Sequence, residues 1–239
     1  MLENVLFVLI MMFSVFLQSL VGFGGTLLAM PLGIMISGIG ITKPVLTFVA
    51  WVTGITVVIS EFRYINKREL VKMVSVMLVG VIAGIWLTGK VDLKILLLAY
   101  AVIVTAIGAK KLFFRSSGQA PAYLRAVSLA VAGIMQGLFV SGGSFLAVYA
   151  TYQIPEKRAF RATVNSVWAV VNTVMMTMYA INGDITGSVA VMSGVCLIPA
   201  LIAVWLGGLL TKKVRQSTFL IIVYLLLIVS GIVLFITNI

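Results

Sequence analysis

Two short stretches of this sequence carry the same set of residues, and the set could bind a negatively charged solute. They lie 118 positions apart and contain Gln18, Gly24, Gly25 and Thr26 in the first stretch and Gln136, Gly142, Gly143 and Ser144 in the second. Adjacent glycines break a helix, and the hydroxyl residue that follows can cap a new one. The start of a helix offers unpaired N–H groups and a partial positive charge, which favour an anion. We therefore expect each stretch to supply half of an anion site.

Four amide side chains can complete such a site. Gln18 and Gln136 precede their glycines by about two helical turns, so each can donate to an oxyanion or brace the break. Asn165 and Asn172 are seven residues apart and therefore share one helix face. Polar side chains within a membrane usually face the interior of the helix bundle. Two alternatives remain: the glycines could simply allow close helix packing, and the asparagines could join neighbouring helices by hydrogen bonds.

Lys43 and Arg161 match at the same spacing of 118 residues. We expect them at opposite mouths of a transport pathway, one outside and one inside, where each would draw anions into a vestibule. The alternative is that they are ordinary flanking charges that fix the orientation of the helices. No acidic or basic side chain lies deep within an expected crossing, which argues against a proton relay through a buried carboxylate.

The composition is that of a membrane protein. Hydrophobic residues make up 62% of the 239 residues, and charged residues make up 10%. Apolar runs long enough to cross about 30 Å of hydrocarbon recur along the whole chain. The chain has no histidine, so it lacks the usual metal ligand and the usual general base. We expect no metal, no cofactor and no enzymatic activity, because the serines beside Gly142 have no base to activate them.

The apolar runs fall into two similar halves. Residues 1–115 form the expected first repeat, residues 116–121 a polar cytoplasmic linker, and residues 122–239 the second repeat. In each half we predict a hairpin broken at the glycines and then three membrane-spanning helices, which gives an all-α fold of about eight to ten membrane segments. The expected blocks are 2–37, 44–60, 70–88 and 93–114 in the first half, and 122–152, 159–181, 185–210 and 217–236 in the second.

The positions of lysine and arginine distinguish parallel from inverted repeats. If the first block of each half crossed the membrane once, nine basic residues would lie inside and eight outside. If that block is a hairpin, fourteen lie inside and three outside, which fits the excess of basic residues in cytoplasmic loops. The three outside are Lys43, Lys90 and Lys94. We therefore predict inverted repeats, with the two hairpin tips meeting near the membrane midplane and both chain termini outside.

Residues 22–31, GFGGTLLAMP, and residues 137–146, GLFVSGGSFL, resemble the glycine-rich motifs of the sulfite exporter TauE/SafE family. Members of that family carry such a motif near the start of each of two homologous halves, and the resemblance covers nearly the whole chain. It implies a multi-pass transporter of the bacterial plasma membrane for sulfite, small organosulfonates or related anions, with the two glycine pairs as motif positions. Many members have a third glycine where this chain has Thr26 and Ser144, which changes the pocket size and the number of donors.

Residues and resemblance together predict an exporter of a small anion, sulfite or an organosulfonate, bound near the midplane by helix N-termini. A transporter or channel-like uniporter for another small anion, such as a carboxylate, is the first alternative. A membrane accessory or assembly subunit is the second. The expected partners are the anion and the lipid bilayer, and assembly into a homo-oligomer stays open. The net charge of +11 comes from residues that flank membrane helices, so no nucleic acid is expected.

Overall fold

The computed structural model describes residues 2–87, 98, 101–102, 105–106, 108–110, 112–113 and 121–238. These residues are mostly α-helical and contain no strand, which confirms the predicted all-α class. The first half contains α1 (Leu2–Val21), α2 (Gly25–Ser37), α3 (Ile39–Glu61), the short 3₁₀ helix η1 (Phe62–Tyr64) and α4 (Lys67–Leu87). The second half contains α6 (Ala122–Phe139), α7 (Gly143–Gln153), α8 (Lys157–Asn182), α9 (Gly187–Lys213) and α10 (Gln216–Asn238). The predicted block 93–114 lies largely outside the described residues.

Six helical segments in the described ranges are long and apolar enough to cross a membrane. They are α1, α3 together with η1, α4, α6, α8 and α9. By contrast, α2 and α7 contain 13 and 11 residues. At 1.5 Å per residue they measure about 20 Å and about 16 Å, which is less than the hydrocarbon thickness of about 30 Å. Each predicted hairpin therefore has one arm too short for a full crossing.

The helices α3 and α8 pack against each other at the centre of the molecule. α8 begins where the carboxylate of Glu156 accepts the N–H groups of Arg158 and Ala159, at 2.9 and 2.5 Å, as an N-cap does. α3 begins at Ile39, earlier than the predicted start at Pro44. That prediction was wrong because it placed the proline in the first turn, whereas the helix accommodates it one turn further in, without one backbone hydrogen bond.

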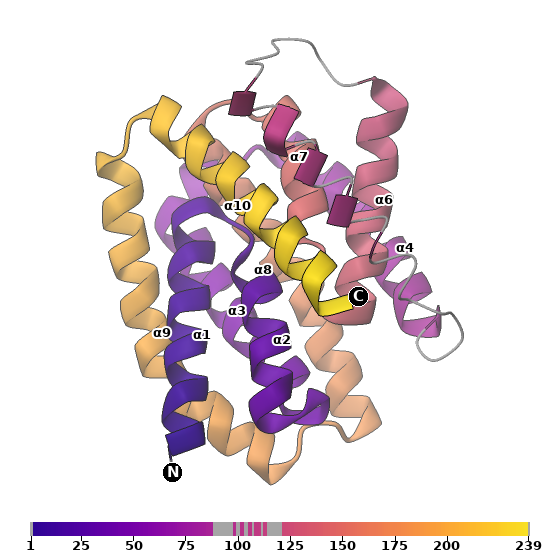
Figure 1. Ribbon diagram of the computed structural model, residues 1–239, viewed down its shortest axis with the longest axis vertical. Coiled ribbons are helices and arrows are strands. Elements are labelled where there is room, and N and C mark those ends of the chain that lie inside the picture. The colour runs from indigo at the N-terminus through magenta and orange to yellow at the C-terminus, as the bar shows by residue number, and fades with distance from the viewer. Residues whose placement is uncertain are drawn as a thin grey trace.

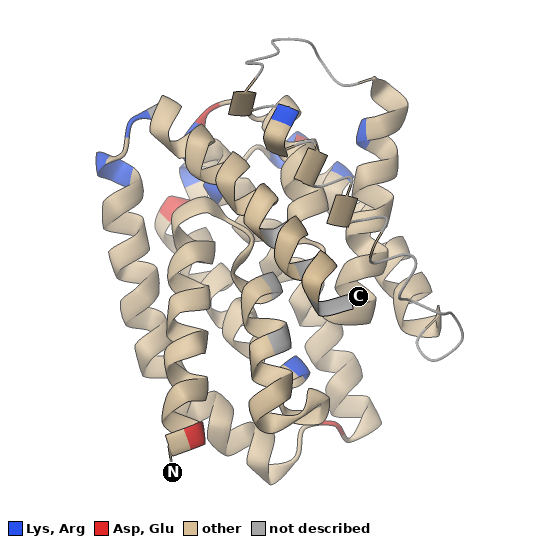
Figure 2. Cartoon of the chain, in the orientation of Figure 1, with Lys and Arg blue, Asp and Glu red and all other residues tan. Residues whose placement is uncertain are grey.

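The two halves exchange helix partners. α1 packs on α9, and α6, its counterpart in the second half, packs on α4. In Figure 1, α1 starts at the lower end of the molecule and α6 starts at the upper end, so these two helices run in opposite directions. Figure 2 shows lysine and arginine gathered towards the upper end. Exchanged partners and opposite directions are what a two-fold relation between the halves would produce.

The contact between α4 and α6 is close because both helices present glycines to it. Gly80 and Gly84 on α4 face Gly133 and Gly137 on α6, and a methyl group on any of them would lie within 2.8 Å of a carbonyl oxygen of the other helix. Small residues four positions apart allow such backbone contact in membranes. The contact fixes the end of α6, and therefore the position of Gln136.

Candidate anion-binding site

The first helix of each hairpin ends in the same way. The N–H of Gly22 donates to the carbonyl of Gln18 at 2.6 Å, and the N–H of Val140 donates to the carbonyl of Gln136 at 2.9 Å. Gly22 and Val140 have φ angles of 99° and 55°, the left-handed conformation that closes many helices. Val140 is β-branched, so this conformation is strained there, and its fully buried side chain holds it in place. The two first arms therefore end alike, but the second arms begin differently, because Gly24 has a left-handed φ of 87° and Gly142 has a right-handed φ of −68°.

The two breaks touch each other inside the protein. α2 follows Gly24 and α7 follows Gly142, the residues that occupy the N-cap positions. A methyl group on Gly143 would lie 3.2 Å from Cβ of Phe23 and 3.4 Å from the backbone nitrogen of Gly24. The start of α7 is therefore in van der Waals contact with the turn that leads into α2. The structure thus brings together the two motifs that are 118 residues apart in the sequence.

The hydroxyl residues after the glycine pairs do not cap the new helices, so that expectation was wrong. Gly24 and Gly142 are the N-caps, and neither helix start has a side-chain cap. Thr26 and Ser144 are the second residues of their helices, past the position from which a side chain can cap. Within the described residues, the N–H groups of the first two residues of α2 and of α7 have no acceptor. These amides remain available to a ligand.

A small cavity lies where the two breaks meet. It is lined by Gln18, Phe23, Gly24, Thr26, Ala50, Gln136, Gly143, Trp168 and Asn172. Six of these had been selected from the sequence: Gln18, Gly24, Thr26, Gln136, Gly143 and Asn172. The cavity has a volume of about 10 Å³, room for roughly one water molecule. The protein is therefore closed around the site in this conformation.

The other glycine of each motif packs the hairpin arms instead of lining the cavity. A methyl group on Gly25 would lie 2.0 Å from the carbonyl oxygen of Ser14 on α1. A methyl group on Gly142 would lie 2.1 Å from the carbonyl oxygen of Ala132 on α6. For these two glycines the structure favours the close-packing alternative.

Two further residues selected from the sequence also lie outside the cavity wall. Asn165 donates through Nδ2 to the carbonyl of Arg161, one turn earlier in α8, at 2.8 Å. The hydroxyl of Ser144 is fully buried and has no hydrogen-bond partner in the part of the chain that the structure describes. Thr26, which lines the cavity, and Ser144 are therefore not equivalent, although the sequence places them at matching positions.

A chain of hydrogen bonds links the second break to Asn172. The N–H of Gly142 donates to Oε1 of Gln136 at 3.2 Å, and Nε2 of Gln136 donates to Oδ1 of Asn172 at 3.1 Å. Gln136 and Asn172 are 2% and 1% exposed, and Nδ2 of Asn172 has no partner among the described residues. Gln136 therefore braces its break. Gln18, the matching residue, lines the cavity, and its side chain has no such bond within the described ranges.

Three cavity residues were not selected from the sequence. Trp168 donates its indole N–H to the carbonyl of Gly22 at 2.8 Å and so holds the end of α1. Ala50 occupies the position 118 residues before Trp168, and Phe23 lies within the first break. The signal for Trp168 was its place between the two asparagines on one face of α8. Neither Ala50 nor Phe23 carries a polar group, so sequence reasoning had no chemistry with which to find them.

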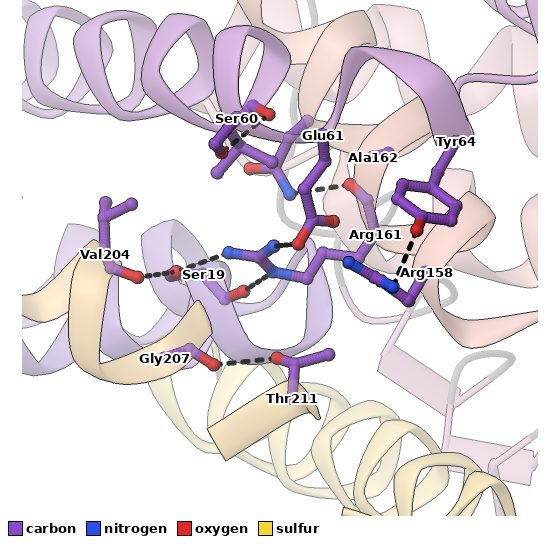
Figure 3. A network of polar contacts seen from close by, with 12 residues as sticks. Ser19, Ser60, Glu61, Tyr64, Arg158, Arg161, Ala162, Val204, Gly207 and Thr211 are labelled. Carbon is purple, nitrogen blue, oxygen red and sulfur yellow. Dashed lines mark hydrogen bonds and ion pairs between the residues drawn. The ribbon is translucent and has the colours of Figure 1, made fainter. Parts of the chain in front are cut away.

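Arg161 is buried in a polar network and does not face an open vestibule. Its Nη1 lies 2.7 Å from Oε1 of Glu61, and the two side chains are 2% and 6% exposed. Nε of Arg161 donates to the carbonyl of Ser19, and Nη2 donates to Oγ of Ser19 at 3.2 Å (Figure 3). Oγ of Ser19 in turn donates to the carbonyl of Val204 at 2.9 Å. The network joins α1, α3, α8 and α9.

Lys43 makes the matching contact with the other hairpin. Its Nζ donates to the carbonyl of Gly137 at 3.2 Å. Lys43 and Arg161 are 118 residues apart, and so are Ser19 and Gly137. Each cation therefore binds the same carbonyl position on the first hairpin helix of the opposite half, in a last turn where positive charge is favoured. Unlike Arg161, Lys43 has no carboxylate within ion-pair distance among the described residues.

The cavity wall offers hydrogen-bond donors and no ionisable side chain. Amides, a hydroxyl and helix N-termini suit a solute that carries several acceptor oxygens. In the ranges that the structure covers, no three His, Cys, Asp or Glu side chains gather to hold a metal ion.

The sequence profile described as "Sulfite exporter TauE/SafE" matches residues 6–234. The chain belongs to the sulfite exporter TauE/SafE family. Family membership confirms the resemblance seen in the glycine motifs and makes the chain a membrane transport protein for anions, not an enzyme. No curated protein and no solved structure matches the chain. In this TauE/SafE protein, each of the two glycine motifs contributes to the wall of one cavity.

Proposed function

We propose that this protein exports sulfite or a small organosulfonate across the bacterial plasma membrane and that the anion binds between the two helix breaks. The observation that carries the proposal is the contact of Gly143 with Phe23, which places the starts of α2 and α7 at one cavity. Two helix N-termini can stabilise an anion without a charged side chain, because their free N–H groups and dipoles both favour negative charge. Membership of the TauE/SafE family supports this class of solute.

In this proposal the halves, residues 1–115 and 122–239, are inverted repeats joined by a linker at 116–121. The matching contacts of Lys43 and Arg161 support the two-fold relation, since each is made across the halves and at the same spacing. The gathering of lysine and arginine at one end, with the N-terminus at the opposite end, supports placing the basic end in the cytoplasm and the N-terminus outside (Figure 2). The C-terminus, which α10 carries away from the basic end (Figure 1), is proposed to be outside as well.

Lys43 and Arg161 would then act at the two entrances to the cavity. Each of these two side chains binds the end of a hairpin helix to the opposite half. To open one entrance, the contact of Lys43 with Gly137 or that of Arg161 with Ser19 must lengthen while the other contact persists. Alternating access follows if the two contacts exchange roles during the cycle. Arg161 is neutralised by Glu61, whereas the charge of Lys43 is available to attract an anion towards the cavity.

The membrane potential can drive export without a coupling ion. An inside-negative potential pushes an anion outward by about 2.3 kcal/mol per charge per 100 mV. The cavity wall contains no carboxylate that could hold Na⁺ or carry a proton. We therefore assign electrogenic transport, with the anion as the moving charge.

Binding is tested by thermal unfolding of the purified protein with sulfite, methanesulfonate, sulfate and acetate. A solute that binds the folded state raises the unfolding temperature, and we expect sulfite and methanesulfonate to do so most. Stabilisation by acetate alone would replace this proposal with a carboxylate transporter. No stabilisation by any anion, with capture of a second membrane protein instead, would indicate an accessory subunit.

Transport is tested in liposomes at a fixed membrane potential set with valinomycin. We expect sulfite flux to follow the potential and to persist when Na⁺ is replaced by choline and the pH gradient is abolished. Flux that stops under either condition while the potential is held would contradict the uncoupled mechanism, although it would leave the anion site in place.

A further inference from the structure

The orientation of the Asn172 amide is set by the backbone of the second break. A backbone N–H can only donate, so the Gly142 N–H requires the oxygen of the Gln136 amide to face it, at 3.2 Å. The other end of that amide is then NH₂, which donates to Sδ of Met175 at 3.8 Å and to Asn172 at 3.1 Å. Because the group that faces Asn172 is a donor, the atom of Asn172 that receives it is the oxygen, Oδ1. The NH₂ group of Asn172 is the end that is left over.

This NH₂ group is a donor without an acceptor. Asn172 is 1% exposed, and its Nδ2 has no partner within the described part of the chain. A buried donor without a partner costs free energy, about 1–3 kcal/mol. Because Asn172 also lines the cavity between the two breaks, a solute oxygen in that cavity can remove the cost.

We propose that Asn172 is a hydrogen-bond donor to the transported anion, that Gln136 is the positioning residue that fixes this donor, and that the pair selects fully deprotonated oxyanions. This inference rests on the proposed function and names the form of the solute. The oxygens of a sulfonate or of the sulfite dianion are all acceptors, and each can receive the Asn172 NH₂. A protonated oxygen is a weaker acceptor whose own O–H would face the NH₂, so protonation of the solute disfavours binding. The Asn172 amide cannot turn to accept that O–H without losing the bond from Nε2 of Gln136 and setting two NH₂ groups against each other.

The test uses titration calorimetry on the purified protein with methanesulfonate, which stays ionised between pH 5 and pH 8, and with sulfite. Asn172→Leu should weaken methanesulfonate binding by roughly 10- to 100-fold, since the bond is to a charged oxygen. Asn172→Asp should bind no methanesulfonate at pH 8, where the carboxylate cannot donate. Binding should return as the pH falls, because a protonated carboxyl is again a donor. Asn182→Asp, at the exposed end of the same helix, is the matched control and should bind normally at both pH values.

The positioning role of Gln136 is tested by a double-mutant cycle. Gln136→Met keeps the length of the side chain and frees the Asn172 amide to turn, so it should weaken methanesulfonate binding by several-fold. Added to Asn172→Leu, it should cause little further loss, because it acts through the amide that is already gone. Additive losses in the double variant would overturn the inference. So would an Asn172→Asp variant that does not regain methanesulfonate binding as the pH falls.

Sulfite tests the selection of the deprotonated form. Its apparent affinity for the wild-type protein should rise with pH as the dianion replaces the protonated monoanion, while that of methanesulfonate should stay flat. Equal affinity for sulfite across this range would overturn the selection. Wild-type protein that binds neither solute would instead overturn the proposed function, and unchanged binding by Asn172→Asp at pH 8 would overturn the inference alone.

Discussion

Gly143 and Phe23 lie against each other across the two halves of the chain, with 3.2 Å between the Cβ of Phe23 and the position that a methyl group on Gly143 would occupy. The contact joins the start of α7 to the turn before α2, and both border the cavity. Because residue 143 is a glycine, the starts of α2 and α7 can touch and still leave room for the cavity between them. The size of residue 143 should therefore affect transport more than it affects folding.

The two glycines of the second motif should respond differently to the same substitution. Gly143→Ala would place a methyl group 3.2 Å from Cβ of Phe23 and 3.4 Å from the backbone nitrogen of Gly24. Shifts of a few tenths of an ångström relieve such contacts at a cost of roughly 1–3 kcal/mol, so we expect normal insertion with sulfite flux about tenfold lower. Gly142→Ala would place a methyl group 2.1 Å from the carbonyl oxygen of Ala132, so we expect a low yield of folded protein. Gly187→Ala, with no atom within 4 Å, is the control. Folded yield and liposome flux measure both effects, and normal flux in Gly143→Ala would contradict the prediction.

Replacing one partner of the buried ion pair between Arg161 and Glu61 should destabilise the protein more than replacing both partners. Glu61→Gln leaves the buried guanidinium without its counter-charge, and Arg161→Met leaves the buried carboxylate without its counter-charge. Each such loss typically lowers the free energy of unfolding by about 3–5 kcal/mol. We expect a large fall in unfolding temperature for each single variant and a smaller fall for the double variant. Lys72→Met serves as the control, since the Lys72 side chain is 48% exposed in its pair with Glu69, and such pairs are worth about 0–1 kcal/mol. A fall in the double variant equal to the sum of the two single falls would show that the pair is not coupled.

The sequence predicted the helices because these depend on local rules, and it predicted the meeting of the two motifs because the chain contains a repeat. Apolar runs of sufficient length must form helices in a bilayer. The glycine pairs at 24–25 and 142–143 interrupt such runs, whereas Gly207 and Gly208 lie within the continuous helix α9, so the pair alone was not sufficient and the repeated pattern around it was the stronger signal. The repeat added long-range information, because residues at matching positions in two similar halves must have related surroundings. The meeting of Gln18, Gln136 and Gly143 at one cavity could be expected on that basis.

Differences between the two halves could not be predicted in the same way. Gln136 braces its break and Gln18 does not; Thr26 lines the cavity and Ser144 does not. These differences arise from packing against neighbours that differ between the halves, such as Trp168 in one and Ala50 in the other. The burial of Arg161 had the same origin, because its partner Glu61 lies in the other half and nothing in the local sequence identifies the pair.

The charge of Lys43 should set the affinity for the anion. Its ammonium binds the carbonyl of Gly137, next to Gln136 in the cavity wall, and has no carboxylate within ion-pair distance in the described residues. Unit charges several ångströms apart interact by about 2 kcal/mol at an effective dielectric constant of about 20. We expect Lys43→Met to raise the KM for sulfite by roughly tenfold and Lys43→Arg to raise it much less. A KM that is unchanged in both variants would assign Lys43 to helix orientation alone.

The indole N–H of Trp168 should stabilise the first break. Trp168→Phe removes the hydrogen bond to the carbonyl of Gly22, which is worth about 0.5–1.5 kcal/mol, and leaves that buried carbonyl without this donor. We expect a lower unfolding temperature together with weaker sulfite binding, since the break forms part of the cavity. Trp205→Phe is the matched control because Trp205 is 64% exposed on the outer surface. Weaker binding in Trp205→Phe alone would contradict this assignment.

Thr26 and Ser144 occupy matching sequence positions but have different surroundings in the structure, so substitutions at both show whether their roles differ. Thr26→Val removes a hydroxyl from the cavity wall at nearly constant volume, so we expect sulfite binding to weaken by about five- to tenfold with little change in stability. Ser144→Ala removes a buried hydroxyl that has no partner in the described residues, so we expect unchanged binding and equal or higher stability. Thr177→Val, which loses an exposed hydroxyl bonded within α8, should alter neither. If the two motifs were functionally equivalent, Thr26→Val and Ser144→Ala would weaken binding to the same extent, and calorimetry with sulfite on the three variants distinguishes these outcomes.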